Sequence, residues 1–358
     1  MQTKMELLLN SNKIKYSVFT EMIKEVRLHN TINFYIDVNS LFDILYRNNN
    51  LEQFHTISRE DELTISSQVI NTIAHYRHYF FSRLQKATIF YLIYSNDKPS
   101  RYYQSLCSDY KKDYMKLRLD KSNNVTSNLQ NNIERNMRLA TSICKYIPNA
   151  YVINVGRNDV GATIQYLIDT ETNKSSSNLV YTNDKTYYQL VNNENTYVIY
   201  NKQDNSKFVT RANLYKVLTK KDDIDVPSDL YKVSLAISGY KKYNLSGVKG
   251  VQTLKSLRIL QKAIDKDIIY NMDYNSIKSI LDKMIEHKLL KEEDRSVIER
   301  NFQLLNLNLM SKVFSDAYLD SIDSQMINNT DYDQIIEVSN KYYPLQPLMF
   351  LELLETFI

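Results

Sequence analysis

The sequence predicts an α/β fold with a central, mostly parallel sheet flanked by helices. Three stretches carry this prediction, each a short β-branched or aromatic run joined to a helical pattern. Residues 32–37 form a strand-like run that ends in Asp37 and continues as a helix, and residues 87–94 form a buried run after a helix predicted over 70–84. Residues 151–168 repeat the order strand, turn and helix. This alternation favours parallel strands joined by crossover connections.

Further elements are predicted on either side of these stretches. Residues 1–30 read as an amphipathic helix with Phe19, Ile23 and Val26 at helical spacing. Residues 178–191 read as another strand, turn and helix. A helix is therefore expected before the first strand, and a further strand after the third.

The second half of the chain is predicted to be mainly helical. Residues 198–218 read as two short strands or a hairpin, and residues 229–237 as a helix that follows Pro227. Apolar residues keep helical spacing over 264–290, and the end of the chain from Pro347 is strongly apolar. A terminal helix of that kind docks on its own core or forms a surface for a protein partner.

Size and composition describe an ordinary globular protein. The chain has 358 residues, of which 43% are hydrophobic and 24% charged, so wholesale disorder is excluded. Such a chain forms one large α/β domain or one domain with a helical extension. The net charge of +4 is compatible with local phosphate binding but does not by itself indicate it.

Cysteine usage and the absence of a targeting pattern favour the cytoplasm. Cys107 and Cys144 are too few for a disulfide framework or a zinc site, which indicates a reducing compartment. The first residues lack the apolar core of a signal peptide, and residues 87–94 are too short to cross a bilayer. No membrane partner is expected. Abundant Asn, Ile, Lys and Tyr with no Trp suggest an AT-rich genome, as in many phages, whose proteins act in the host cytoplasm.

Residues 234–256 are the most informative stretch, because three of the five glycines of the chain fall within it. Gly247 and Gly250 flank a turn of the kind that brings backbone N–H groups close to a phosphate. Basic residues lie beside this turn or one helical turn beyond it: Lys249, Lys255 and Arg258. The local chemistry favours a nucleic-acid backbone.

This stretch resembles the helix-three-turn-helix signature of the flap endonuclease and phage 5′-3′ exonuclease family, A-x-x-G-D-x-x-D-N-[IL]-P-G-V-x-G-[IV]-G. The matching residues are Ala236, Gly239, Asn244, Leu245, Gly247, Val248, Gly250 and Val251. Tyr240 and Tyr243 stand where the family has metal-binding aspartates, Ser246 replaces the proline, and Gln252 replaces the last glycine. The resemblance therefore implies that the DNA-binding half of the motif is retained.

Other family blocks follow in the correct order between Ile32 and Leu307. The block after the second strand is matched by Lys98, Pro99 and Arg101, and the centre of Y-P-x-Y-K-x-x-R by Tyr110 and Lys111. A later block is matched by Asp184, Lys185, Gln189 and Leu190. Residues 298–308 resemble R-N-x-x-L-I-D-L. The resemblance implies a PIN-like (5′ nuclease) domain over 1–228 with an arch at 101–136. It further implies a helix-three-turn-helix region over 229–307 and a C-terminal helical extension over 308–358.

The family cleaves phosphodiesters with two divalent ions about 4 Å apart, held by a ring of carboxylates. Only Asp37, Asp159 and Asp184 remain of that ring. The lost positions carry Tyr94 or Ser95, Gly156, Asn158, Thr186, Tyr240 and Tyr243, Arg157 lies among them, and Asp97 comes two or three residues late. One weak metal site is conceivable, whereas a two-metal site is improbable. An alternative for Asp37 is that it only caps the next helix, because Asn39 and Ser40 follow it.

These residues support a leading hypothesis and two alternatives. The leading one is a catalytically inactive, flap endonuclease-like DNA-binding protein that acts as an accessory or structural subunit in viral or phage DNA replication, repair or transcription. The second is a weakly active metal-dependent 5′ nuclease in which Asp37, Asp159 and Asp184, with Asp97 recruited, bind one Mg²⁺ or Mn²⁺. The third is a structural subunit whose DNA-facing surface serves protein contacts.

The leading hypothesis assigns contacts to both halves of a duplex/single-strand junction. Lys249, Lys255 and Arg258, with backbone N–H groups of Gly247 and Gly250, hold duplex phosphates, around a K⁺ ion as in the family. The single-stranded portion is contacted by Lys111, Lys112 and Arg118. An alternative for this basic and aromatic stretch is a solvated helix whose tyrosines pack on the core.

Overall fold

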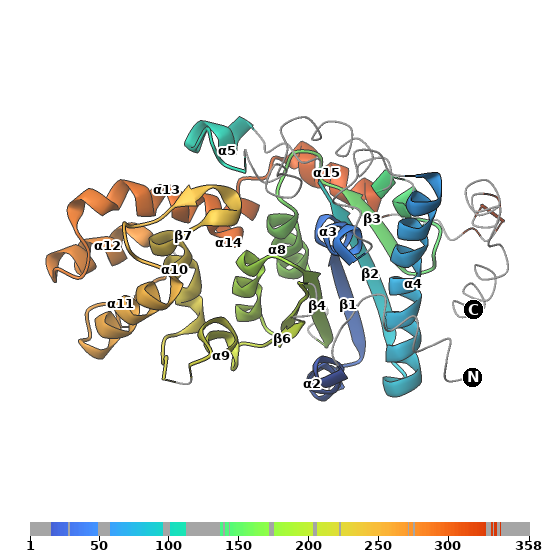
Figure 1. Ribbon diagram of the computed structural model, residues 1–358, viewed down its shortest axis with the longest axis horizontal. Helices are drawn as coiled ribbons and strands as arrows, with labels where there is room; N and C mark the ends of the chain where they lie inside the picture. The colour runs from blue at the N-terminus through green and yellow to red at the C-terminus, as the bar shows by residue number, and fades with distance from the viewer. Residues whose placement is uncertain are drawn as a thin grey trace.

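The computed structural model describes residues 16–27, 29–48, 58–95, 101–111, 137–138, 140–142, 144–171, 175–202, 206–221, 223–270, 272–274 and 276–326, with residues 331, 333–334 and 337. It confirms the predicted α/β class (Figure 1). A six-stranded sheet forms the centre and helices cover both of its faces. In the described part of the chain, no helix is long and apolar enough to cross a membrane.

The sheet has the strand order β3-β2-β1-β4-β5-β6. Neighbouring strands are parallel, except that β6 runs antiparallel to β5 as the second strand of a hairpin. The bounds are β1 Thr31–Asp37, β2 Ala87–Tyr94, β3 Ala150–Asn154, β4 Ser176–Thr182, β5 Thr196–Tyr200 and β6 Lys207–Val209. The central strands β1 and β4 are buried on both faces, which explains their near-continuous apolar and aromatic sequences.

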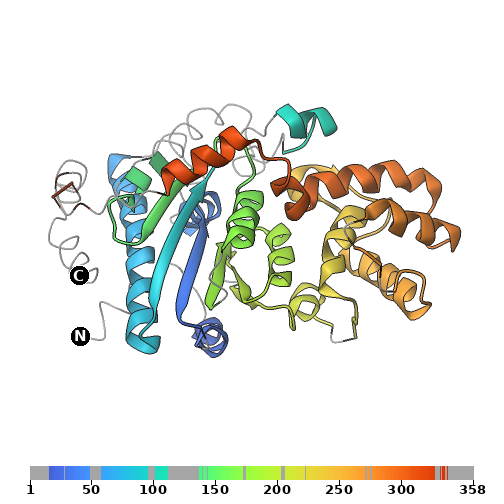
Figure 2. The same cartoon turned by 180° about the vertical axis from the view of Figure 1, so that it is seen from behind.

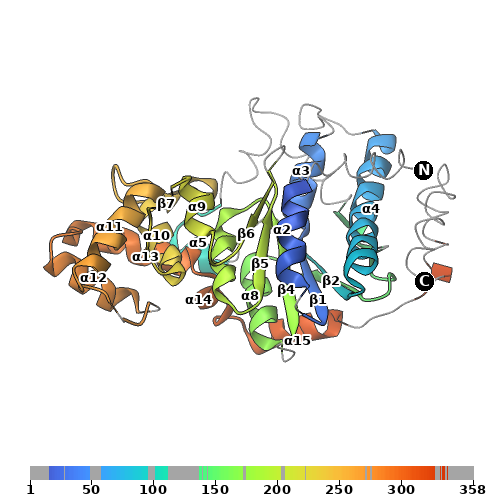
Figure 3. The ribbon, with the colours of Figure 1, turned by 90° about the horizontal axis from the view of Figure 1, so that it is seen from below.

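Three helices cover one face of the sheet: α2 Tyr16–Val26, α3 Val38–Asn48 and α4 Arg59–Leu84 (Figure 3). Phe19 and Val26 of α2 are buried as predicted, whereas Met22 lies deeper than Ile23. The start predicted at residue 70 for α4 is wrong by about three turns, because the helix begins after Ser58. The Ser58 hydroxyl accepts a hydrogen bond from the Asp61 amide and so caps the first turn.

The other face is covered by α8 Val160–Thr170, the 3₁₀ helix η2 Lys185–Asn192 and α14 Leu307–Ser311, with α9 Leu214–Thr219 following β6. Helix α15 Asp316–Gln325 lies against the edge strand β3 (Figure 2). Its Gln325 side chain accepts a hydrogen bond from the Asn154 amide at 2.8 Å, which covers part of an open sheet edge.

A group of helices lies beside the sheet: α10 Tyr231–Ser238, α11 Thr253–Asp265, α12 Ile277–Glu286 and α13 Arg295–Leu305 (Figure 1). The small strands β7 Gly239–Tyr240 and β8 Leu245–Ser246 lie between α10 and α11, and α5 Arg101–Leu106 lies near α13. Short 3₁₀ turns complete the order: η3 Ser228–Leu230, η4 Lys241–Tyr243 and η5 Glu292–Asp294.

Residues 264–290, over which apolar residues keep helical spacing, span parts of two helices rather than one continuous helix. Asp267 adopts a left-handed conformation with φ 54°. Its amide bonds the Ile264 carbonyl and the next amide bonds the Ala263 carbonyl, which is the hydrogen-bond pattern of a Schellman stop. Lys288, with φ 57°, ends α12 in the same way. Apolar spacing persists across both stops, so periodicity alone did not reveal them.

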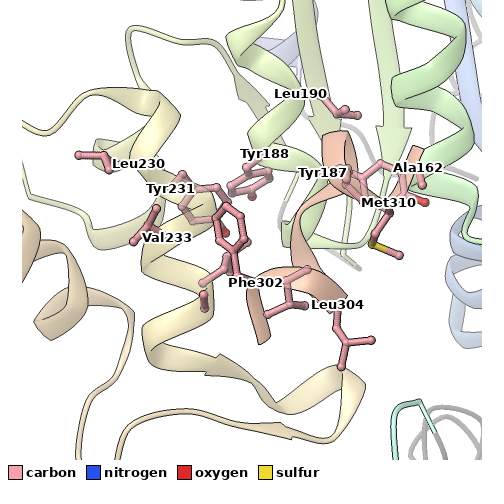
Figure 4. Packing of buried hydrophobic residues seen from close by; sticks show 14 of the residues in the cluster. Ala162, Tyr187, Tyr188, Leu190, Leu230, Tyr231, Val233, Phe302, Leu304 and Met310 are labelled. Atoms are coloured by element: carbon pink, nitrogen blue, oxygen red, sulfur yellow. The ribbon is translucent and has the colours of Figure 1, made fainter. Parts of the chain in front are cut away.

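The helical group shares a core with the sheet domain. Tyr187 and Tyr188 of η2 pack with Tyr231 of α10 and with Phe302 and Leu304 of α13 in one buried cluster (Figure 4). This cluster crosses the boundary predicted between residues 228 and 229, which remains a sequence-based division. Of the predicted extension over 308–358, the described part includes α15 and the end of α14, and the apolar segment from Pro347 lies outside the described residues.

Candidate functional site

The three remaining carboxylates of the predicted cation site lie together at the carboxyl edge of the sheet. Asp37 ends β1, Asp184 follows the parallel neighbour β4, and Asp159 precedes α8. All three are buried, and all three act electrostatically on the hydroxyl of Tyr187. The pKa of Tyr187 is raised, first by burial and then by these three negative charges. We call the group of Asp37, Asp159 and Asp184 the aspartate cluster.

Each member of the aspartate cluster caps a helix. Asp37 Oδ1 accepts the Ser40 amide at 3.1 Å, Asp159 Oδ1 accepts the Ala162 amide at 3.0 Å, and Asp184 Oδ1 accepts the Thr186 amide at 2.9 Å. Such caps satisfy amides that have no partner within their helix, and a negative charge there also complements the helix dipole. Helix capping accordingly gives all three carboxylates a role that requires no metal.

Lys111 is the counterion of Asp159. Its Nζ lies 2.7 Å from Asp159 Oδ2 and 4.1 Å from the ring centre of Tyr243, and its side chain is 18% exposed. The backbone is held as well, because the Lys111 amide donates to the Tyr243 carbonyl at 3.0 Å. The residue predicted to contact single-stranded DNA therefore lies against a buried carboxylate, and its DNA contact remains a prediction.

Lys242 is the counterion of Asp184. Its Nζ lies 2.9 Å from Asp184 Oδ2 and 2.8 Å from Asn183 Oδ1. The Tyr240 hydroxyl donates to Asp184 Oδ1 at 2.9 Å. Burial alone would raise the pKa of Asp184, but Lys242 and the hydrogen bonds from Thr186 outweigh it and lower the pKa to about 2. Asp184 is consequently an ionised carboxylate whose Oδ1 accepts hydrogen bonds and whose Oδ2 forms an ion pair with Lys242.

Asp37 is held by hydroxyl groups rather than by a direct ion pair. Its Oδ2 accepts hydrogen bonds from Ser40 at 2.5 Å, Tyr187 at 3.0 Å and Thr182 at 3.3 Å. Burial raises the pKa of Asp37, and these donors and the more distant charge of Lys242 offset the rise only in part. The aspartate cluster therefore contains one carboxyl group that binds its proton more tightly than an exposed aspartate does.

Tyr240 and Tyr243, which the sequence resemblance aligns with aspartates, lie beside the aspartate cluster: Tyr240 bonds Asp184, and the ring of Tyr243 lies under Lys111. Their rings lie 5.0 Å apart, and Tyr110 packs on Tyr243 at 5.6 Å. Tyr110 is buried and its hydroxyl bonds the Leu304 carbonyl at 3.4 Å. The alternative in which the tyrosines of this stretch pack on the core is thus correct for Tyr110 and Tyr103, whereas Tyr102 is 48% exposed.

This donor set does not fit a pair of divalent cations. Among the described residues, no group of three or more His, Cys, Asp or Glu side chains could hold a metal ion. A cation approaching Asp159 or Asp184 would meet an ammonium group already within 3 Å of the carboxylate, and like charges repel. Asp97, the proposed additional ligand, lies outside the described residues.

Lys242 and Tyr187 are site residues that the sequence reasoning missed. Lys242 could have been identified from the sequence, because it is a cation between Tyr240 and Tyr243, the two tyrosines that the resemblance aligns with motif aspartates. Tyr187 carried none, since a tyrosine after Thr186 reads equally well as core. The pairing of Lys111 with Asp159 joins residues 48 positions apart and required the fold.

The glycine-rich connection between α10 and α11 has two distinct parts. Gly239 and Gly247 pack backbone against backbone: a Cβ on Gly247 would lie 2.2 Å from the Ser238 carbonyl carbon, and one on Gly239 would lie 2.3 Å from the Gly247 nitrogen. Gly250 instead is exposed and has φ +73°, and a Cβ added to it would meet no atom within 4 Å. Gly247 thus serves close packing, and Gly250 supplies the open, left-handed turn.

The basic residues of this connection are at the surface. Lys249 and Lys255 are exposed, and Lys255 Nζ bonds the Gly250 carbonyl at 3.2 Å, which holds it over the turn. Arg258, one turn further along α11, pairs with Asp223 at 2.5 Å. Lys112 and Arg118, predicted to contact a single strand, lie outside the described residues.

A side-chain amide links this connection to the helices behind it. Asn301 of α13 is fully buried, and its Nδ2 donates to the Ala236 carbonyl at 3.0 Å and to the Ser246 carbonyl at 2.9 Å. Gln189 makes a similar bridge, donating to the Leu305 carbonyl and accepting from the Leu307 amide where the chain turns from α13 into α14. The segment around 298–308 therefore leads the chain from α13 back onto the helices of the sheet domain.

No protein-family model and no curated protein matches this sequence. Solved structures do match its fold. A bacteriophage T5 protein co-crystallised with metal ions aligns at TM-score 0.54 and 13% identity over 91% of this chain and 99% of its own. The T5 flap endonuclease, in a pseudo-enzyme-product complex with DNA and metal ions, aligns at TM-score 0.53 and 13% identity over 91% and 98%. The T5 5′-exonuclease with bound zinc aligns at TM-score 0.52 and 14% identity over 91% and 100%. The protein therefore has the flap endonuclease-like 5′ nuclease fold.

Proposed function

We propose that this protein is a DNA-binding, catalytically inactive member of the flap endonuclease-like group that acts as an accessory or structural subunit in DNA metabolism. The observation that carries the proposal is the internal neutralisation of the aspartate cluster. Lys111 and Lys242 hold their ammonium groups 2.7 and 2.9 Å from Asp159 and Asp184. Cleavage by this fold needs divalent ions at these carboxylates, and here the counterions belong to the chain.

The DNA-binding half of the proposal rests on the connection between α10 and α11. Gly250 opens a left-handed turn, Lys249 and Lys255 are exposed beside it, and α11 begins directly after it. Free amides at the start of a helix together with lysines form a phosphate-binding surface. The T5 flap endonuclease complex contains DNA on the same fold, which supports a DNA partner for this chain.

A salt-dependent binding assay tests the DNA half. We expect the full chain to bind flap, forked and plain duplex DNA at low salt, and Lys249→Gln with Lys255→Gln to lower the slope of log K against log [salt] by about two. Lys266→Gln with Lys278→Gln removes the same charge from exposed positions at the far end of α11 and the start of α12, and serves as the control. Equal effects of the two double variants, or no binding below about 10 µM at low salt, would contradict DNA binding at this turn.

A metal-binding measurement tests the proposed catalytic inactivity. We expect titration calorimetry with Mn²⁺ to show no binding at the aspartate cluster and labelled 5′-flap DNA to remain intact in Mn²⁺. The competing function is a weak metal-dependent 5′ nuclease. Cleavage that disappears in Asp184→Asn would establish that function and overturn ours, whereas cleavage that persists in that variant would come from a contaminant.

A further inference from the structure

A second basic surface lies next to the aspartate cluster, at the end of the β5–β6 hairpin. It consists of Lys185, Lys202, Lys207 and Lys220, which we call the lysine row. Lys185 is the first residue of η2, and Lys202 follows β5. Lys207 begins β6 opposite Tyr200, and Lys220 ends α9. None of these residues belongs to the motif around Gly250.

One hydrogen bond and the mutual electrostatic effects of the four lysines show that their side chains lie near one another. Lys207 Nζ donates to the Val217 carbonyl at 3.0 Å, which joins the start of β6 to the last turn of α9 and so to Lys220. Lys185 lies in the field of Lys202, and Lys207 lies in the fields of Lys185 and Lys220. The pKa values of Lys185 and Lys207 are lowered, first by burial and then by these neighbouring lysines. Like charges are therefore concentrated here at an electrostatic cost.

Two carboxylates near the lysine row, among the residues that the structure describes, are already paired. Asp184, adjacent to Lys185, is neutralised by Lys242. Asp223, three residues after Lys220, is paired with Arg258. Lys185, Lys202 and Lys220 are exposed. A polyanion from outside would relieve the repulsion among them.

The lysine row is continuous with the basic side of α11. The Arg258–Asp223 ion pair ties α11 to the segment that follows α9, and the Asp225 amide donates to Gln261 Oε1 of α11 at 2.6 Å. The row and the turn at Gly250 thus lie on elements that contact each other. A rod-like polyanion reaches both surfaces more readily than a compact anion does.

We propose that the lysine row is a second phosphate-contacting surface, which extends the path of a DNA duplex from the turn at Gly250 past α9 to the carboxyl edge of β5. The inference rests on the proposed DNA-binding function and assigns it a further set of residues. DNA is favoured over an acidic protein segment because the row adjoins the turn-side lysines, which suit a regular phosphate backbone.

The experiment compares two charge-matched triple variants of the full chain. The test variant carries Lys185→Gln, Lys202→Gln and Lys220→Asn, and it leaves Lys207 in place because that side chain holds Val217. Asparagine is chosen for Lys220 because this residue has φ 58°, which asparagine tolerates. The control carries Lys266→Gln, Lys278→Gln and Lys288→Asn, three exposed lysines of which the last has φ 57°.

Binding to a mixed-sequence duplex of about 20 base pairs is measured across a salt series, and folding is checked by circular dichroism. We expect the test variant to bind about tenfold more weakly at low salt and to lose two to three units of salt slope, whereas the control loses less than one. Equal behaviour of the two triple variants would overturn the inference and leave DNA binding at Lys249 and Lys255 intact. Loss of polyglutamate binding without loss of DNA binding would overturn it in favour of an acidic protein partner.

Discussion

Replacing Lys242 by methionine removes the counterion of a buried carboxylate and tests how the aspartate cluster is held together. Asp184 is 1% exposed, and its pKa is about 2 against an ordinary value of 3.8. At about 1.4 kcal/mol per pKa unit, this difference corresponds to about 2 kcal/mol of stabilisation at pH 7. Breaking a buried pair from one side costs about 3–5 kcal/mol, and the partial exposure of Lys242 reduces that cost. We expect Lys242→Met to lower the free energy of unfolding by about 2–3 kcal/mol at pH 7.

The pH dependence has a definite sign. The folded-state pKa of Asp184 lies below that of the unfolded chain, so its stabilisation is complete above about pH 4 and is lost as pH falls from about 4 to about 2. Asp37 behaves in the opposite way, because its raised pKa favours the folded state at low pH and this contribution is lost as pH rises through the folded-state pKa. Without Lys242, burial raises the pKa of Asp184, so the deficit of Lys242→Met should begin to narrow above about pH 4 and continue to narrow as pH falls to about 2.

Urea denaturation of four proteins measures the coupling directly: wild type, Lys242→Met, Asp184→Asn and the double variant. Asparagine keeps a side-chain oxygen that can accept the Thr186 amide, so Asp184→Asn removes the charge while preserving the cap. We expect the double variant to be more stable than Lys242→Met, because no unpaired charge remains buried. Strictly additive losses, or a cost below about 0.5 kcal/mol for Lys242→Met, would refute the neutralisation that we infer.

Three further outcomes follow from the structure. Lys111→Ala combined with Lys242→Ala should bind Mn²⁺ more tightly than the wild type in titration calorimetry, because both internal cations are gone; equal binding would show that they do not exclude metal. Gly247→Ala should cost more than about 2 kcal/mol by urea denaturation, because its Cβ would overlap the Ser238 backbone, whereas Gly250→Ala should cost about 1 kcal/mol from its positive φ alone; the reverse order would refute this. Asn301→Ala should cost about 1–3 kcal/mol by the same measurement, because the buried Ala236 carbonyl loses this donor and the Ser246 carbonyl keeps only Arg300, and a neutral effect would contradict that role.

The sequence was sufficient for the features that depend on local pattern. The strand over 87–94 and the helix after Asp37 follow from apolar runs, and the bend near Gly247 from its glycines. Contacts between residues far apart in the chain could not be predicted from the local sequence pattern. Nothing in the residues around Lys111 indicates Asp159 as its partner, because the two meet only after α8 and the segment following α5 pack on the same edge of the sheet. The stops at Asp267 and Lys288 were missed because neither position carries glycine, the usual residue of a left-handed cap.

The arrangement of charges explains how three buried carboxylates are stabilised side by side. Each member of the aspartate cluster caps a helix, so its removal would expose an unpaired amide as well as alter the cluster. Three buried negative charges without divalent ions would repel one another, and Lys111 and Lys242 supply two of the three opposing charges. The third carboxyl group, that of Asp37, has a raised pKa and is surrounded by hydroxyl donors. Capping thus gives each carboxylate a structural role, and two lysines offset much of the negative charge that would otherwise attract a metal.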